Sequence, residues 1–151
     1  MNQPVACTDT AVRLDPDPTG VNNEYLFLTT DPSEVGRART YAEDRARRLG
    51  MGDLAYEAVL VTSELVTNAV REQSIYFPNE MVIFRVTSET AGPGEQRLRI
   101  EVTDRSPAIP WVRKAIPMAE SGRGLMIVSQ IARDMGYETR PEGGKTVWTV
   151  L

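Results

Sequence analysis

Glu64 and Asn68 are the two residues whose types and spacing best suit a chemical role. They stand four positions apart in a segment, from Leu54 to about Glu72, whose apolar residues repeat with helical spacing, so a helix would place both side chains on one face. A carboxylate accepts the proton of a hydroxyl or orients water, and an amide oxygen is a hard ligand suited to Mg²⁺. The pair fits phosphoryl transfer, and it also fits the solvated face of an amphipathic helix.

Asp104 is the second candidate, because it follows a strand with strict alternation and continues the parity of that strand's buried residues. An acid on the core face needs a partner. That partner is either an exocyclic amine, such as N6 of adenine, or the turn at residues 105–107, which the aspartate would cap. The residues alone favour the turn.

Two glycine-containing segments offer backbone N–H groups to an anion. Gly122-Arg123-Gly124 opens a helix, and a helix start presents free N–H groups and a positive dipole end. It also fits a helix start that needs close packing or a positive φ. Gly143-Gly144-Lys145-Thr146 is similar to the end of a phosphate-binding loop, but it lies between two strands and is therefore interpreted as a hairpin turn.

The elements that must position these residues follow from periodicity and punctuation. A strand at Tyr25–Leu28 precedes a helix that starts at Asp31-Pro32-Ser33-Glu34 and continues to Leu49. The remaining expected elements are the helix at 54–72, a hairpin with strands around 82–86 and 98–102, a proline-rich loop at 105–121 that would act as a lid, a helix after residue 122, and a closing hairpin with strands at 137–140 and 146–151.

This order predicts an α+β fold, a two-layer α/β sandwich with one mixed or mostly antiparallel sheet and helices on one face. A doubly wound parallel sheet is disfavoured because the hairpins leave too few crossover helices. We expect residues 1–20 to form a flexible arm without chemistry and residues 21–151 to form a single domain.

Composition excludes several classes of protein. The 151 residues contain no histidine, which excludes Ser-His-Asp and Cys-His catalysis, imidazole metal sites and histidine autophosphorylation within this chain. The net charge of −4 argues against nucleic acid as a partner. One cysteine, a polar start and no long apolar run predict a soluble cytoplasmic protein without a membrane segment.

In order along the chain, four motifs together resemble the N box and the three G boxes of GHKL-type ATPase and kinase domains. They are Glu64-Leu65-Val66-Thr67-Asn68-Ala69, Asp104, Gly122-Arg123-Gly124-Leu125 and Gly144-Lys145-Thr146. The resemblance covers the chain after residue 24. In detail, SELVTNAV, GRGLMIV and GGKTVWTVL look most like the small single-domain bacterial anti-sigma-factor serine kinases.

The resemblance implies a Bergerat sandwich that binds ATP and Mg²⁺ between the helices and a lid. It implies that Asn68 coordinates Mg²⁺, that Glu64 is the base that activates a serine or water, and that Asp104 accepts the adenine amine. Thr146 would support Asp104 through its hydroxyl and an ordered water. The other residues implied to bind nucleotide are Arg71, Ser106, Gly122, Arg123, Gly124 and Leu125.

Two departures from the family pattern bear on activity. The first G box has Ser106 where Asp-x-Gly is usual, and Glu72 stands where many relatives have a histidine, which brings negative charge toward the phosphates. Arg71 would offset that charge.

The function implied is an anti-sigma factor that sequesters a sigma factor and phosphorylates a serine or threonine of a STAS-type anti-anti-sigma partner, with a homodimer also implied. The alternative is a non-catalytic regulator that binds proteins through the same fold, with weak or absent nucleotide binding.

Overall fold

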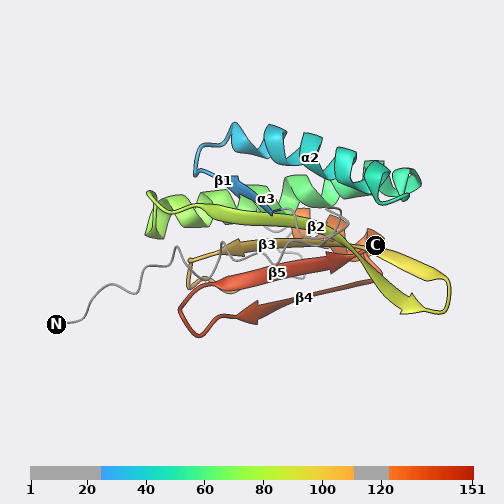
Figure 1. Cartoon of the computed structure of the whole chain (residues 1–151). Helices are drawn as coiled ribbons and strands as arrows, with labels where there is room; N and C mark the ends of the chain where they lie inside the picture. Colours follow the sequence, from blue (N-terminus) through green and yellow to red (C-terminus); the bar gives the residue numbers. More distant parts are fainter. Residues whose placement is uncertain (1–24, 111–122) are drawn as a thin grey trace.

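The computed structural model describes residues 25–110 and 123–151, so the expected arm and most of the expected lid lie outside the described residues. Within them, one five-stranded sheet has the order β1-β2-β3-β5-β4, and every neighbouring pair is antiparallel. The predicted α+β class is therefore confirmed (Figure 1). The strands are β1 (Tyr25–Leu28), β2 (Val82–Gly92), β3 (Glu95–Asp104), β4 (Asp134–Thr139) and β5 (Lys145–Val150).

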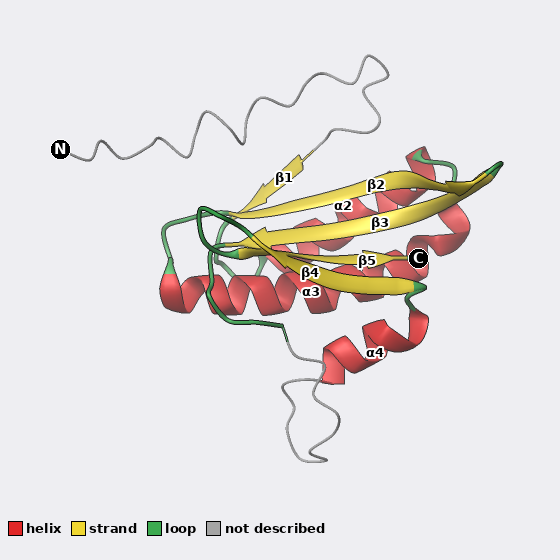
Figure 2. Cartoon of the chain, turned by 90° about the horizontal axis from the view of Figure 1, so that it is seen from below, coloured by secondary structure: helices red, strands yellow, loops and turns green. Residues whose placement is uncertain are grey.

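The helices form the second layer. The helices α2 (Glu34–Arg48) and α3 (Ala55–Tyr76) cover one face of the sheet, with a short 3-10 turn, η1 (Gly52–Leu54), leading into α3. The third helix, α4 (Arg123–Ile131), lies beside α3 (Figure 2). None of the helices in the described part of the chain is long and apolar enough to cross a membrane.

The core lies between these two layers, and its residues follow the helical period on α3 and the two-residue period on the strands. The stripe of α3 expected from helical spacing is buried, and so are the alternating residues of β2 and β3. On α2 the buried residues are mostly alanines, which let the helix approach its neighbours closely. The main members of the core are Ala38, Ala42, Ala46, Ala58, Val61, Leu65, Ala69, Val82, Phe84, Val86, Leu98, Ile100 and Val102.

The last turn of α3 extends beyond the predicted end near Glu72 because a polar residue has a partner there. Gln73 is fully buried, and its Oε1 accepts the backbone N–H of Arg105 at 2.7 Å. This bond ties the end of α3 to the segment that leaves β3. A pattern of apolar residues does not reveal a buried glutamine, so the predicted helix stopped one turn too early.

Candidate functional site

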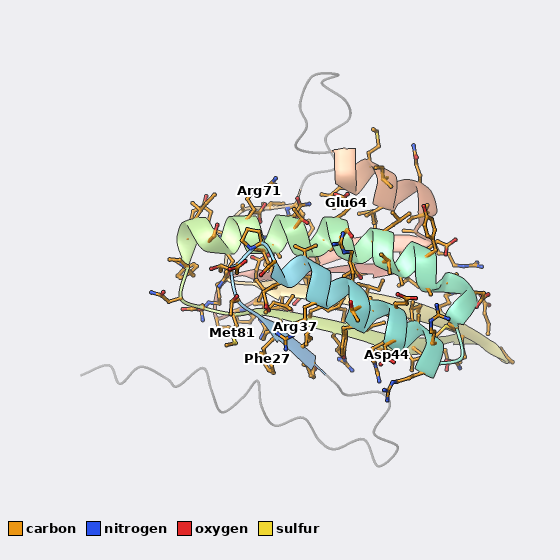
Figure 3. All side chains as sticks on the ribbon, turned by 90° about the horizontal axis from the view of Figure 1, so that it is seen from above. Phe27, Arg37, Asp44, Glu64, Arg71 and Met81 are labelled. Carbon is orange, nitrogen blue, oxygen red and sulfur yellow. The ribbon has the colours of Figure 1, made fainter. Side chains whose placement is uncertain are left out.

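The candidate residues are carried by four elements, α3, α4, β3 and β5. Helix α3 supplies Glu64, Asn68 and Arg71, and α4 packs beside it. Figure 3 shows Glu64 where α3 faces α4, and Arg71 further toward the end of α3. Asp104 comes from the end of β3, and Lys145 from the start of β5.

The Glu64 carboxylate lies directly against the first turn of α4. A Cβ atom built on Gly124 would stand 1.7 Å from Glu64 Oε2 and 2.6 Å from its Cδ, so only glycine leaves room for this side chain. The positive end of the helix dipole favours a carboxylate at this position. Gly124 therefore serves close packing, one of the two roles that its sequence context left open.

Asn68 lies one turn further along α3 on the same half-buried face as Glu64. Its Oδ1, the atom expected to hold Mg²⁺, accepts a hydrogen bond from Arg71 Nη2 at 3.1 Å. Among the described residues, no group of three or more acidic, cysteine or histidine side chains could hold a metal ion by itself. Mg²⁺ at Asn68 would depend on ligands from phosphates and water.

Asp104 is buried, as the strand parity predicts, and is 2% exposed. Its Oδ1 accepts the backbone N–H of Ser106 at 2.8 Å, which is the turn-capping role that the residues alone favoured. Ser106 is also buried, and its Oγ accepts the N–H of Ala108 at 3.0 Å. The acid and the serine thus order the chain as it leaves the sheet.

The same Asp104 oxygen binds a cation from the chain itself. Lys145 Nζ lies 3.0 Å from Asp104 Oδ1 and 2.9 Å from Glu72 Oε2, and Lys145 is only 3% exposed. Burial raises the pKa of Asp104 above its ordinary value of 3.8. Lys145 and the Ser106 N–H lower the pKa of this carboxyl, and the charge of Glu72 raises it further. We call Glu72, Lys145 and Asp104 the buried triad.

The register of β3 and β5 explains why Lys145, and not Thr146, reaches Asp104. Asp104 pairs with Lys145, whereas Thr146 pairs with Thr103, and adjacent residues point to opposite faces of a sheet. The Thr146 and Thr103 hydroxyls lie 2.8 Å apart. The expected support of Asp104 by Thr146 is therefore corrected, because their side chains lie on opposite faces.

Sequence reasoning missed Lys145, although a signal for it was present. Val147 and Thr149 are buried on the helical side of β5, and Lys145 shares their parity. The turn before it also needs glycine, since Gly144 has φ +83° and a Cβ there would lie 2.1 Å from the Asp104 carbonyl oxygen. This close approach brings the start of β5 onto the end of β3.

Three further residues expected to bind nucleotide are Gly122, Arg123 and Leu125. Gly122 lies outside the described residues, as does Trp111 of the expected lid, and the side chain of Arg123 is not described. Leu125 is 5% exposed and packs in the core, so its side chain holds α4 in place. The roles expected for these residues stay predictions.

This sandwich, with a carboxylate and an amide on α3 next to the first turn of α4, has the architecture of an ATP-binding domain. The chain matches the histidine kinase-like ATPase domain family over residues 28–151, and it belongs to that family. None of the curated proteins matches the sequence. Family membership supports ATP binding and leaves the reaction and the partners open.

The two ends of the site fit ATP differently. The phosphate end contains a base, Glu64, a hard oxygen donor, Asn68, and the first turn of α4. These groups suit Mg²⁺ and phosphates. At the other end, the acid suited to a base amine already holds an ammonium group. The phosphate end therefore fits the nucleotide as the site stands, whereas adenine recognition through Asp104 Oδ1 requires displacement of Lys145.

Proposed function

We propose that this protein is an ATP- and Mg²⁺-dependent anti-sigma factor that sequesters a sigma factor and phosphorylates a serine or threonine of a STAS-type anti-anti-sigma partner. The observation that supports this most directly is the Glu64 carboxylate, held against the first turn of α4 on the same face as Asn68. This arrangement brings a proton acceptor to the helix start where phosphates are favoured.

Each residue at that end has a role in the proposal. ATP supplies the phosphoryl group when it is bound. Glu64 accepts the proton of the partner's hydroxyl and orients its oxygen, and Asn68 Oδ1 holds Mg²⁺. Arg71, which already binds that oxygen at 3.1 Å, turns toward the phosphates when Mg²⁺ takes its place. The proposal also includes a cytoplasmic location and a homodimer.

The buried triad favours a second candidate function, a non-catalytic regulator that binds its protein partner without phosphoryl transfer. Glu72 adds negative charge near the end of α3, and Lys145 occupies the acid suited to a base amine. In this candidate the fold presents a protein-binding surface, and nucleotide binding is weak or absent.

Calorimetry followed by a transfer assay separates the two candidates. We expect Mg²⁺ to strengthen ATP binding by the wild type, and Asn68→Ala to lose that strengthening, with Thr67→Ala as the matched control on the exposed side of the same helix. Each variant is then incubated with ATP and STAS-type proteins. These proteins are examined by mass spectrometry for phosphoserine or phosphothreonine. We expect transfer by the wild type and none by Glu64→Ala.

Stable ATP binding without transfer to any STAS-type protein would favour the non-catalytic regulator. Transfer that survives Glu64→Ala would remove the base assignment.

A further inference from the structure

We infer that Lys145 is a specificity-determining residue that suppresses recognition of the nucleotide base, because its ammonium group holds the carboxylate that would otherwise accept a base amine. The inference rests on the proposed function, since it concerns the nucleotide site of the same domain. Lys145 then competes with the nucleotide base for the Asp104 carboxylate.

The contacts of Lys145 give the first step of the argument. The ammonium lies between two carboxylates, 3.0 Å from Asp104 Oδ1 and 2.9 Å from Glu72 Oε2. Its side chain is 4% exposed, and that of Asp104 is 1% exposed. A ligand amine cannot reach the bonded oxygen of Asp104 without moving the ammonium group.

The relative strength of the two donors gives the second step. The amine of a purine base is a neutral donor, whereas Lys145 is a cation, so the ammonium adds the attraction of a full opposite charge to its hydrogen bond with the Asp104 carboxylate. Displacement would also leave a buried ammonium with one carboxylate less, which is costly. A base amine therefore loses the competition for Asp104 Oδ1.

The backbone prevents an easy escape of the lysine. Lys145 is paired with Asp104 across β3 and β5, and Gly144 approaches the Asp104 carbonyl so closely that a Cβ there would be 2.1 Å away. The lysine is thus fixed opposite the acid by strand register, and only its side chain can move. ATP binding to the wild type then depends mainly on the phosphate end of the site.

The test compares ATP with inorganic tripolyphosphate, which lacks the base, by calorimetry at the same Mg²⁺ concentration. The proteins are the wild type, Lys145→Met and the double variant Glu72→Gln/Lys145→Met. The double variant keeps the net charge of the triad at −1 with Asp104 as its only ion, so it protects the test against misfolding of the single variant. Circular dichroism confirms folding of each.

Arg97→Met is the matched control, because it also removes one cation from the sheet. Arg97 pairs with Glu95 near the β2–β3 turn, seven residues along β3 from Asp104, or about 23 Å at the usual rise of a strand. We expect it to bind both ligands within twofold of the wild type.

We expect both lysine variants to bind ATP at least tenfold more tightly than the wild type and tripolyphosphate within twofold of it. If ATP affinity is unchanged or falls in a folded lysine variant, the inference is overturned, and a fall would mean that Lys145 itself donates to the base. In that case Mg²⁺-dependent ATP binding by the wild type still upholds the proposed function. If no folded protein binds either ligand, the inference and the nucleotide part of the proposed function fail together.

Discussion

Removal of Lys145 should destabilise the fold in a way that depends on Asp104. In Lys145→Met the apolar chain keeps much of the volume, but Glu72 and Asp104 lose the cation between them. Breaking a buried ion pair by removing one partner costs about 3–5 kcal/mol. Two features place this variant at the lower end of that range.

The first feature is Glu72, whose side chain is 21% exposed and can turn toward solvent when the lysine is gone. The second is Asp104, whose pKa burial already raises, so that it takes up a proton more readily than an ordinary aspartate. We therefore expect a loss of about 3 kcal/mol in the free energy of unfolding at pH 7.

A double-mutant cycle with Asp104→Asn tests the origin of this loss. Asparagine can still accept the Ser106 N–H, but it carries no charge that needs a cation. The double variant Asp104→Asn/Lys145→Met should therefore be more stable than the sum of the single losses implies, with a coupling of about 1–3 kcal/mol.

The assay is urea unfolding followed by circular dichroism, with stability taken from linear extrapolation. Two results would refute the reasoning. One is a loss below about 1 kcal/mol in Lys145→Met, and the other is additivity of the two substitutions, since residues that do not interact give additive losses.

Two further predictions concern Gly124 and Asp104. Gly124→Ala should abolish phosphotransfer, because the added Cβ displaces the end of the Glu64 side chain. It should change the free energy of unfolding by less than about 1 kcal/mol, because that end is flexible and alanine favours the helix. Full transfer in a correctly folded variant would argue against Glu64 as the base. Because the pKa of Asp104 is raised, the folded chain binds the proton of this carboxyl more tightly than the unfolded chain does. The contribution of Asp104 to the free energy of unfolding therefore falls as pH rises from 3.8 to the raised pKa, and it is constant above it. Urea unfolding across this range should show the wild type losing stability relative to Asp104→Asn as pH rises, and a relative gain would mean that Lys145 outweighs burial.

Much of the fold could be predicted because its signals are local. The alternation of β3 predicted not only a strand but also the burial of Asp104 at its end, and the helical spacing of α3 predicted which residues reach the core. The hairpin expected with strands around 82–86 and 98–102 and the glycines before Lys145 predicted where the chain reverses between antiparallel strands. These features depend on neighbours within a few positions.

The polar interior could not be predicted in the same way, because its partners are distant in sequence. Gln73 binds the chain 32 residues away, and Lys145 reaches across 41 and 73 residues to its two carboxylates. Such contacts depend on which strands become neighbours and in which register. A shift of one position would have brought Thr146 to Asp104, and that shift is the difference between the expected site and the one observed.

The place of β5 in the sheet affects how the protein can be made. The strand that starts at Lys145 lies between β3 and β4, and Leu151 exchanges both backbone hydrogen bonds with Leu98 at its far end. On a translating ribosome, β3 therefore keeps an open edge, and Asp104 lacks its cation, until residues 145–151 have left the exit tunnel. Until then the unfinished sheet exposes an unpaired strand edge, which is the kind of surface that promotes association between incomplete chains.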